Sequence, residues 1–149
     1  MRRLLRIVLV ICVGSVIGWG VVAGLPTVRA QEQSAVEQMG VREADTWLGL
    51  VDSGQYAESW DAAAAVFKSA VTVEKWKSAM KQARDPLGKM QSRIVQSATH
   101  TTVLPGVPDG DYVVLLYESS FENKKLAQET VILSREKDKV LRVAGYYIK

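Results

Sequence analysis

The sequence predicts an α+β domain in which three N-terminal helices pack on a four-stranded antiparallel meander. Apolar residues recur at helical spacing between positions 36 and 85. From Arg93 onward, β-branched and aromatic residues dominate and the apolar period falls to two. Short polar turns separate the last segments, which favours neighbouring strands joined in chain order.

Three helices open the predicted domain. Apolar residues at helical spacing predict the first over residues 36–51 and the second over residues 56–67, whose run of alanines allows close approach to a neighbour. The third, over residues 72–85, has Thr72 as its N-cap and stops at Pro86, which cannot continue the helix. Four strands then follow, at residues 92–103, 112–121, 126–135 and 140–148.

The short turns between the last three strands predict a register. A turn centred on Asn123 and Lys124 sets Glu118 opposite Glu129, and the next turn sets Glu129 opposite Tyr146. Both faces of the sheet then carry apolar residues, which a sheet covered on one side does not need. Either the sheet curls around its own core, or its second face meets a partner subunit.

An export signal precedes the domain. Three arginines at the N-terminus lead into an apolar run over residues 7–25, and the small residues Val28 and Ala30 suit cleavage after Ala30. We therefore expect a signal peptide over residues 1–30, a single α+β domain over residues 31–149, and a periplasmic or secreted location. The alternative is an uncleaved anchor in the inner membrane, because the apolar run is long enough to cross a bilayer.

The charge and cysteine content of the mature chain exclude several classes of function. The predicted leader holds four of the nineteen basic residues and none of the sixteen acidic ones, so the mature chain has no basic excess that would indicate nucleic acid. The only cysteine, Cys12, lies in the leader, which excludes disulfides and thiol catalysis in the mature chain. With His100 as the only histidine and no glycine-rich phosphate loop after a strand, we expect no metal and no cofactor.

Several unusual motifs recur in order along residues 44–149. They include Trp47-Leu48, Ser59-Trp60, Pro86-Leu87-Gly88, Glu129-Thr130-Val131 and Gly145-Tyr146-Tyr147-Ile148. In these motifs the chain resembles the small exported bacterial proteins grouped as domain of unknown function 4019, a resemblance that transfers no catalytic residue. That family usually ends with an Asp-Gly turn and a Trp before the last strand, where this chain has Asp138-Lys139 and Leu141.

The order of helices and strands also resembles the cone-shaped fold of the nuclear transport factor 2-like superfamily. There a curved sheet wraps a long helix and leaves a pocket at the wide end. Isomerases, dehydratases, carriers and dimerisation modules share that fold, so the resemblance implies a place for a site and not its chemistry.

The candidate catalytic residues are Glu118, Glu129 and Tyr146. Two carboxylates on one face repel each other, so one can stay protonated near neutral pH and act as a general acid or base, with Tyr146 as a hydrogen-bond donor. The alternative is a structural network in which Arg93 or water satisfies the acids. Tyr56 and Trp60, together with Arg93, are the candidate ligand-binding residues, because aromatic side chains can line a pocket.

From these observations we expect an exported, cofactor-free binding or assembly module that forms a homodimer through its sheet. Its partner would be a small apolar ligand or an envelope protein, and not nucleic acid. One alternative is a small isomerase or lyase that acts on an apolar substrate through Glu118 or Glu129. Another is an envelope protein tethered to the membrane by its uncleaved leader.

Overall fold

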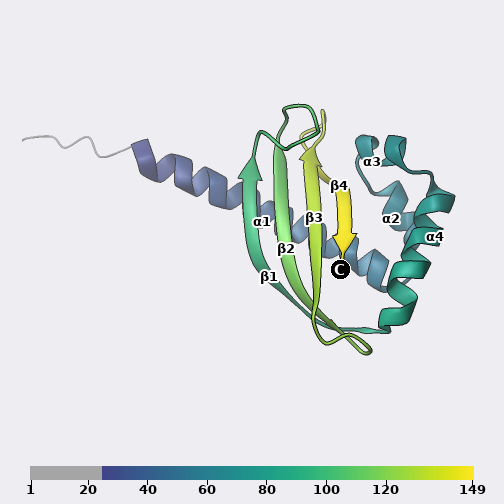
Figure 1. Ribbon diagram of the computed structural model, residues 1–149. Coiled ribbons are helices and arrows are strands. Elements are labelled where there is room, and N and C mark those ends of the chain that lie inside the picture. Colours follow the sequence, from purple (N-terminus) through teal and green to yellow (C-terminus); the bar gives the residue numbers. More distant parts are fainter. Residues whose placement is uncertain (1–24) are drawn as a thin grey trace, which may run out of the picture.

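The computed structural model describes residues 25–149, so Cys12 and nearly all of the predicted leader lie outside the described residues. Within this range, helices precede one open sheet of four antiparallel strands in the order β1-β2-β3-β4 (Figure 1). The α+β class and the antiparallel meander are therefore confirmed.

The helical part differs from the prediction in two places. The helices are α1 (Leu25–Asp52), α2 (Tyr56–Asp61), α3 (Ala65–Ala70) and α4 (Val73–Arg84), followed by one 3-10 turn, η1 (Asp85–Leu87). Helix α1 begins well before position 36, and the helix predicted over residues 56–67 is divided into α2 and α3. Between them Ala64 is extended, and its N–H donates to the carbonyl oxygen of Val143 at 2.8 Å. A hydrogen bond to β4 thus replaces a turn of helix.

The start of α4 agrees with the prediction. The Thr72 hydroxyl accepts a hydrogen bond from the Lys75 N–H at 3.4 Å, as an N-cap does. Trp76 and Met80 lie on the buried stripe of this helix. None of the helices between residues 25 and 149 has both the length and the apolar character needed to cross a bilayer.

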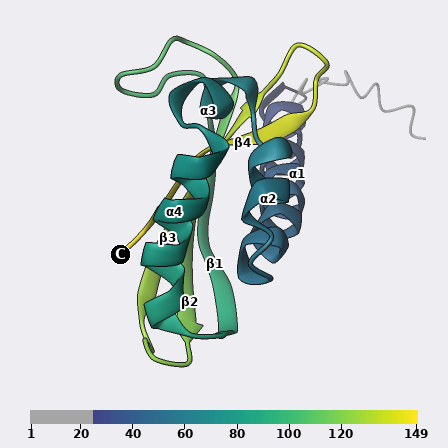
Figure 2. The same ribbon diagram turned by 90° about the vertical axis from the view of Figure 1, so that its right-hand side faces the viewer.

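The four strands lie within two residues of their predicted bounds. They are β1 (Met90–Thr101), β2 (Tyr112–Phe121), β3 (Ala127–Arg135) and β4 (Leu141–Ile148). Helix α1 crosses one face of the sheet behind the strands in Figure 1, and the side view shows α1 on one side of them, with α2 and α4 toward the viewer (Figures 1 and 2). We call the face toward α1 the inner face and the opposite one the outer face.

The hydrophobic core lies between the inner face and the helices. Trp47 and Leu48 of α1 pack there with Trp76 of α4 and Phe67 of α3. Alternate residues of the strands complete it, namely Val113, Leu115, Tyr117, Val131, Leu133, Leu141, Val143 and Tyr146. Burial of these large apolar side chains is the main force that holds the two layers together.

The predicted register between β2 and β3 is wrong by one residue. Glu118 is opposite Gln128, and Glu129 is opposite Tyr117. The turn closes between Phe121 and Lys124, where the Phe121 N–H donates to the Lys124 carbonyl oxygen at 2.7 Å, so it is centred one residue earlier than predicted. Because side chains alternate between faces, this slip puts Glu118 on the outer face and Glu129 on the inner face.

The register between β3 and β4 also differs from the prediction. Glu129 is opposite Ile148, and Tyr146 is opposite Val131. An irregularity beside Ile132 gives β4 one extra residue and shifts the later pairs. Tyr146 is therefore a diagonal neighbour of Glu129 on the inner face, close enough for a long side chain to reach it.

Candidate functional site

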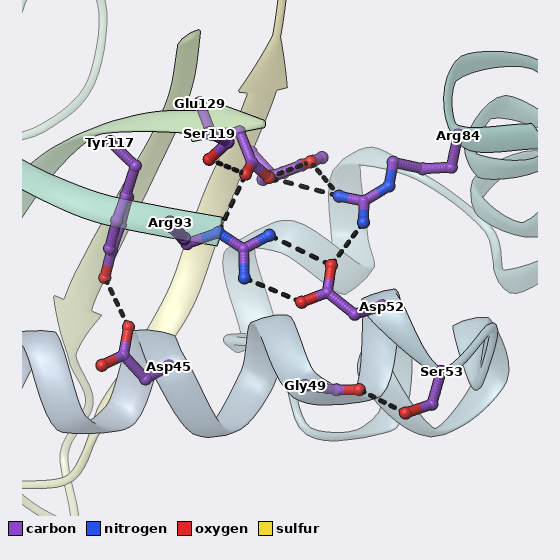
Figure 3. A network of polar contacts seen from close by, with 10 residues as sticks. Asp45, Gly49, Asp52, Ser53, Arg84, Arg93, Tyr117, Ser119 and Glu129 are labelled. Atoms are coloured by element: carbon purple, nitrogen blue, oxygen red, sulfur yellow. Dashed lines mark hydrogen bonds and ion pairs between the residues drawn. The ribbon is translucent and has the colours of Figure 1, made fainter. Parts of the chain in front are cut away.

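The carboxylate of Glu129 is fully buried on the inner face and holds four hydrogen bonds (Figure 3). Its Oε1 accepts from the Arg93 Nε at 2.9 Å and from the Ser119 hydroxyl at 2.5 Å. Its Oε2 accepts from the Tyr146 hydroxyl at 2.6 Å and from the Arg84 Nη1 at 3.2 Å. Both oxygens are thus occupied by donors of the protein itself.

A second carboxylate, Asp52, joins the two arginines from the other side. Arg93 donates to it through Nη1 at 2.7 Å and Nη2 at 3.0 Å, which makes a bidentate pair. The Arg84 Nη2 also pairs with its Oδ1. Two acids therefore compensate two guanidinium groups, and the Asp52 side chain, 18% exposed, marks the solvent edge of this arrangement.

Each element that meets here contributes one residue. We call the set the Glu129 network: Asp52 from α1, Arg84 from α4, Arg93 from β1, Ser119 from β2, Glu129 from β3 and Tyr146 from β4. Charged hydrogen bonds thus connect the ends of two helices to all four strands. This connection fixes the position of the helices on the sheet.

Aromatic rings enclose the network. The guanidinium carbon of Arg84 lies 4.6 Å from the ring centroid of Phe121, which places the cation over an aromatic face. The Tyr146 ring centroid lies 5.5 Å from that of Trp47 and 6.1 Å from that of Trp76. These apolar walls keep water away and strengthen the charged hydrogen bonds inside.

The surroundings of the network raise the pKa of two of its donors, Tyr146 and Arg93. Burial, and then the charge of Glu129, raise the pKa of the Tyr146 hydroxyl, so it stays a donor. For Arg93, burial lowers the pKa, but hydrogen bonds to Asp52 and Glu129 outweigh it and the net pKa is raised. Both side chains therefore keep their protons near neutral pH and remain hydrogen-bond donors in the network.

The predicted catalytic pair of Glu118 and Glu129 is not formed. Glu118 is exposed on the outer face, whereas Glu129 is on the inner face. Glu129 and Tyr146 do come together, at 2.6 Å, but Glu129 has no exposed surface through which a substrate could reach it. The arrangement matches the structural network that the sequence left as the alternative, with Arg93 as one of its donors.

The three candidate ligand-binding residues lie in different surroundings. Tyr56 lines a hollow of about 340 Å³ beside Asp52 and Arg84. The Trp60 indole donates to the Val71 carbonyl oxygen at 2.8 Å and packs against the core. Arg93 is held in the Glu129 network. These residues therefore do not form one pocket wall.

Asp52, Arg84 and Ser119 belong to the network but were not predicted as site residues. Helical spacing indicates that two of them lie on the buried side of their helices. Arg84 follows the buried Met80 by four residues, and Asp52 follows the buried Leu48 by four. A charged residue that continues a buried stripe indicates a buried ion pair. Ser119 continues the inward alternation of β2, where Tyr117 and Phe121 flank it.

His100 takes part in a separate surface cluster. Its Nε2 lies 2.7 Å from the Asp111 Oδ1, and the Arg135 Nε donates to the other oxygen of Asp111 at 2.6 Å. Over residues 25–149 no group of three His, Cys, Asp or Glu side chains is placed to hold a metal ion.

The outer face carries exposed apolar side chains on the central strand β2 and on both edge strands, β1 and β4. Ile94 is 59% exposed, Leu116 45% and Tyr147 64%. A hollow of about 370 Å³ opens beside Leu116, lined by residues that include Gln96, Glu118, Gln128, Thr130 and Lys149. Exposed apolar side chains with polar residues beside them are typical of an interaction surface.

Comparison with known proteins finds one family. The sequence model of the family described as "Protein of unknown function (DUF4019)" matches residues 43–146, well over half of the chain. No curated protein and no solved structure matches.

Proposed function

The chain belongs to the DUF4019 family of proteins of unknown function, and we propose a role for it from the contrast between the two faces of its sheet. We propose that it is an exported, non-catalytic binding or assembly module that works through the outer face of its sheet. The Glu129 network then has a structural role: it holds the helices on the inner face and leaves the outer face free.

The contrast between the two faces carries this proposal. On the inner face every buried polar side-chain atom of residues 25–149 has a hydrogen-bond partner, and Glu129 has four. On the outer face Leu116 of the central strand β2 and Tyr147 of the edge strand β4 are exposed. Exposed apolar side chains on an uncovered sheet face favour contact with a partner, since their burial releases water.

The proposed location follows from the N-terminal sequence. Three arginines followed by an apolar run are typical of an export signal, so we place the domain in the periplasm or outside the cell. If the leader stays uncleaved, the same domain is held at the inner membrane. Either place leaves the outer face free to meet another envelope protein, a second copy or a small apolar ligand.

We also place the fold in the cone-shaped class of the nuclear transport factor 2-like superfamily. The long helix α1, which crosses the inner face of a single antiparallel meander, supports this assignment. The outer face is the face of the sheet that α1 does not cover (Figures 1 and 2). The assignment agrees with assembly through that surface and carries no chemistry.

A photo-crosslinking amino acid at position 116 in the full chain, irradiated in the cells that produce it, tests the proposed function. The proposal predicts a covalent adduct from position 116 and none from position 78, an exposed position on α4. Ser78 is a matched control because it is exposed on the same domain but faces away from the sheet. Equal labelling at both positions, or none at either, would contradict a binding module on the outer face.

A further inference from the structure

On the outer face, residues that are opposite each other in β2, β3 and β4 form rows across the sheet. Four such rows follow from the strand register and from the backbone hydrogen bonds between Gln128 and Lys149. From one end of the sheet to the other these rows are Glu118-Gln128-Lys149, Leu116-Thr130-Tyr147, Val114-Ile132-Gly145 and Tyr112-Ser134-Arg142. Two rows have complementary residues on β2 and β4: the acid Glu118 with the base Lys149, and the apolar Leu116 with the aromatic Tyr147.

We propose that the occupant of the outer face is a second copy of this chain, related by a two-fold axis that runs along β3. The inference rests on the proposed function and names its partner. Rotation about this axis leaves each row at the same position along the strands. It exchanges β2 and β4, which lie on either side of β3, so β2 of one copy lies over β4 of the other. Sheets that pack face to face commonly keep their strands nearly aligned in this way.

In this arrangement each row of one copy lies over the same row of the other copy, with the β2 and β4 ends of the row exchanged. Glu118 meets Lys149 of the partner subunit, an acid against a base. Leu116 meets Tyr147 of the partner subunit, an apolar side chain against an aromatic ring. Both contacts occur twice, because a two-fold interface repeats every pair.

The charges of Glu118 and Lys149, which lie in one row, favour a second copy of the chain over an unrelated protein as the occupant of the outer face. Neither Glu118 nor Lys149 forms an ion pair with another residue in the range 25–149. Both line the same hollow beside Leu116. A face that holds one unpaired acid and one unpaired base in the same row is complementary to itself under this two-fold axis.

Gly145 supplies an independent observation. Its backbone does not require glycine, because its φ is not in the left-handed region. A Cβ added there would lie 3.6 Å from the Ile132 Cδ1 and 3.6 Å from the Tyr147 Cε2, which are ordinary contacts. The irregularity in β4 adjoins Gly145, and glycine often marks such a bulge, so the isolated domain supplies one reason for glycine here. Close approach of another chain is a second reason, and in the proposed dimer Val114 of the partner subunit lies over this position.

Charge reversal tests the interface in the full chain, with sedimentation equilibrium to measure dimerisation and urea unfolding to check the fold. We expect Glu118→Lys and Lys149→Glu each to raise the dimer Kd about tenfold, because like charges then meet at two equivalent places. The double variant should restore the wild-type Kd. Glu58→Lys, which reverses an exposed acid on α2, should leave the Kd unchanged. Gly145→Ala should raise the Kd without lowering the urea midpoint at protein concentrations below that Kd.

The possible results separate this inference from the proposed function. If the double variant stays as weak as the single ones, the β2-over-β4 arrangement is wrong. If the chain is monomeric while position 116 crosslinks to a different protein, the second copy is wrong and the binding module stands. If position 116 gives no adduct and the chain is monomeric, both are wrong.

Discussion

The hydroxyl oxygen of Tyr146 lies 2.6 Å from the Glu129 Oε2, although the two residues are not opposite each other in the sheet. Tyr146 reaches diagonally from its place opposite Val131, and it also accepts a hydrogen bond from the Arg84 Nη1 at 3.0 Å. One phenol therefore links β4 to the carboxylate on β3 and the guanidinium on α4. Contacts of this kind fix how the helices sit on the sheet.

Loss of the buried negative charge should destabilise the fold. Glu129→Gln keeps the size of the side chain but leaves Arg84 and Arg93 with Asp52 as their only acidic partner in the network. We expect the free energy of unfolding to fall by about 3 kcal/mol, as when one member of a buried ion pair is removed. Urea denaturation measures it.

Glu58→Gln is the matched control for that experiment, because Glu58 is an exposed acid on α2, outside the Glu129 network and the outer face. It should change the free energy of unfolding by less than about 0.5 kcal/mol. Equal effects of the two substitutions would show that the network does not hold the fold together.

Removal of the Tyr146 hydroxyl should have a smaller effect. Tyr146→Phe keeps the ring among Trp47 and Trp76 but removes one hydrogen bond to Glu129 and one from Arg84. We expect a loss of about 1–2 kcal/mol in the free energy of unfolding. The adjacent, exposed Tyr147→Phe should be near neutral, and a larger effect there than at Tyr146 would contradict the assignment of Tyr146 to the network.

Much of this fold could be predicted because local patterns determine it. The change from helical spacing to alternation near Arg93 located all four strands, and Thr72 located the start of α4. The network could not be predicted because it depends on register. A turn centred one residue earlier than expected moved Glu118 to the outer face, and the extra residue in β4 changed the partner of Tyr146. Hydrophobic alternation on both faces leaves such a slip undetermined.

The turn before β4 contains a strained residue. Lys139 has a φ of 69°, in the left-handed region that favours glycine. The sequence resemblance also puts an Asp-Gly turn at this place. Lys139→Gly should therefore raise the free energy of unfolding by about 1 kcal/mol. Thermal unfolding measures this, and a lower melting temperature for the variant would show that the Lys139 side chain stabilises the turn.

Asp138 should contribute to the acid sensitivity of the domain. Hydrogen bonds from the Arg142 side chain, followed by one from the Val140 N–H, lower the pKa of Asp138 from 3.8 to about 2. A lowered folded-state pKa stabilises the fold above about pH 4, and this contribution disappears as the pH falls toward 2.

Urea midpoints of the wild type and Asp138→Asn between pH 6 and pH 2 test this sign. The wild type should have the higher midpoint above pH 4, and the difference should vanish near pH 2. A difference that grows as the pH falls would contradict the lowered pKa.

The mass of the assembly recovered from the cell envelope tests the account most directly. Native mass spectrometry of the wild type should show a complex heavier than one chain. The Leu116→Lys variant, which places a charge on the central strand β2 of the outer face, should show a single chain, with the wild-type urea midpoint at protein concentrations where both chains are dissociated. A wild-type mass of one chain without a partner or ligand would contradict a module that works through this face.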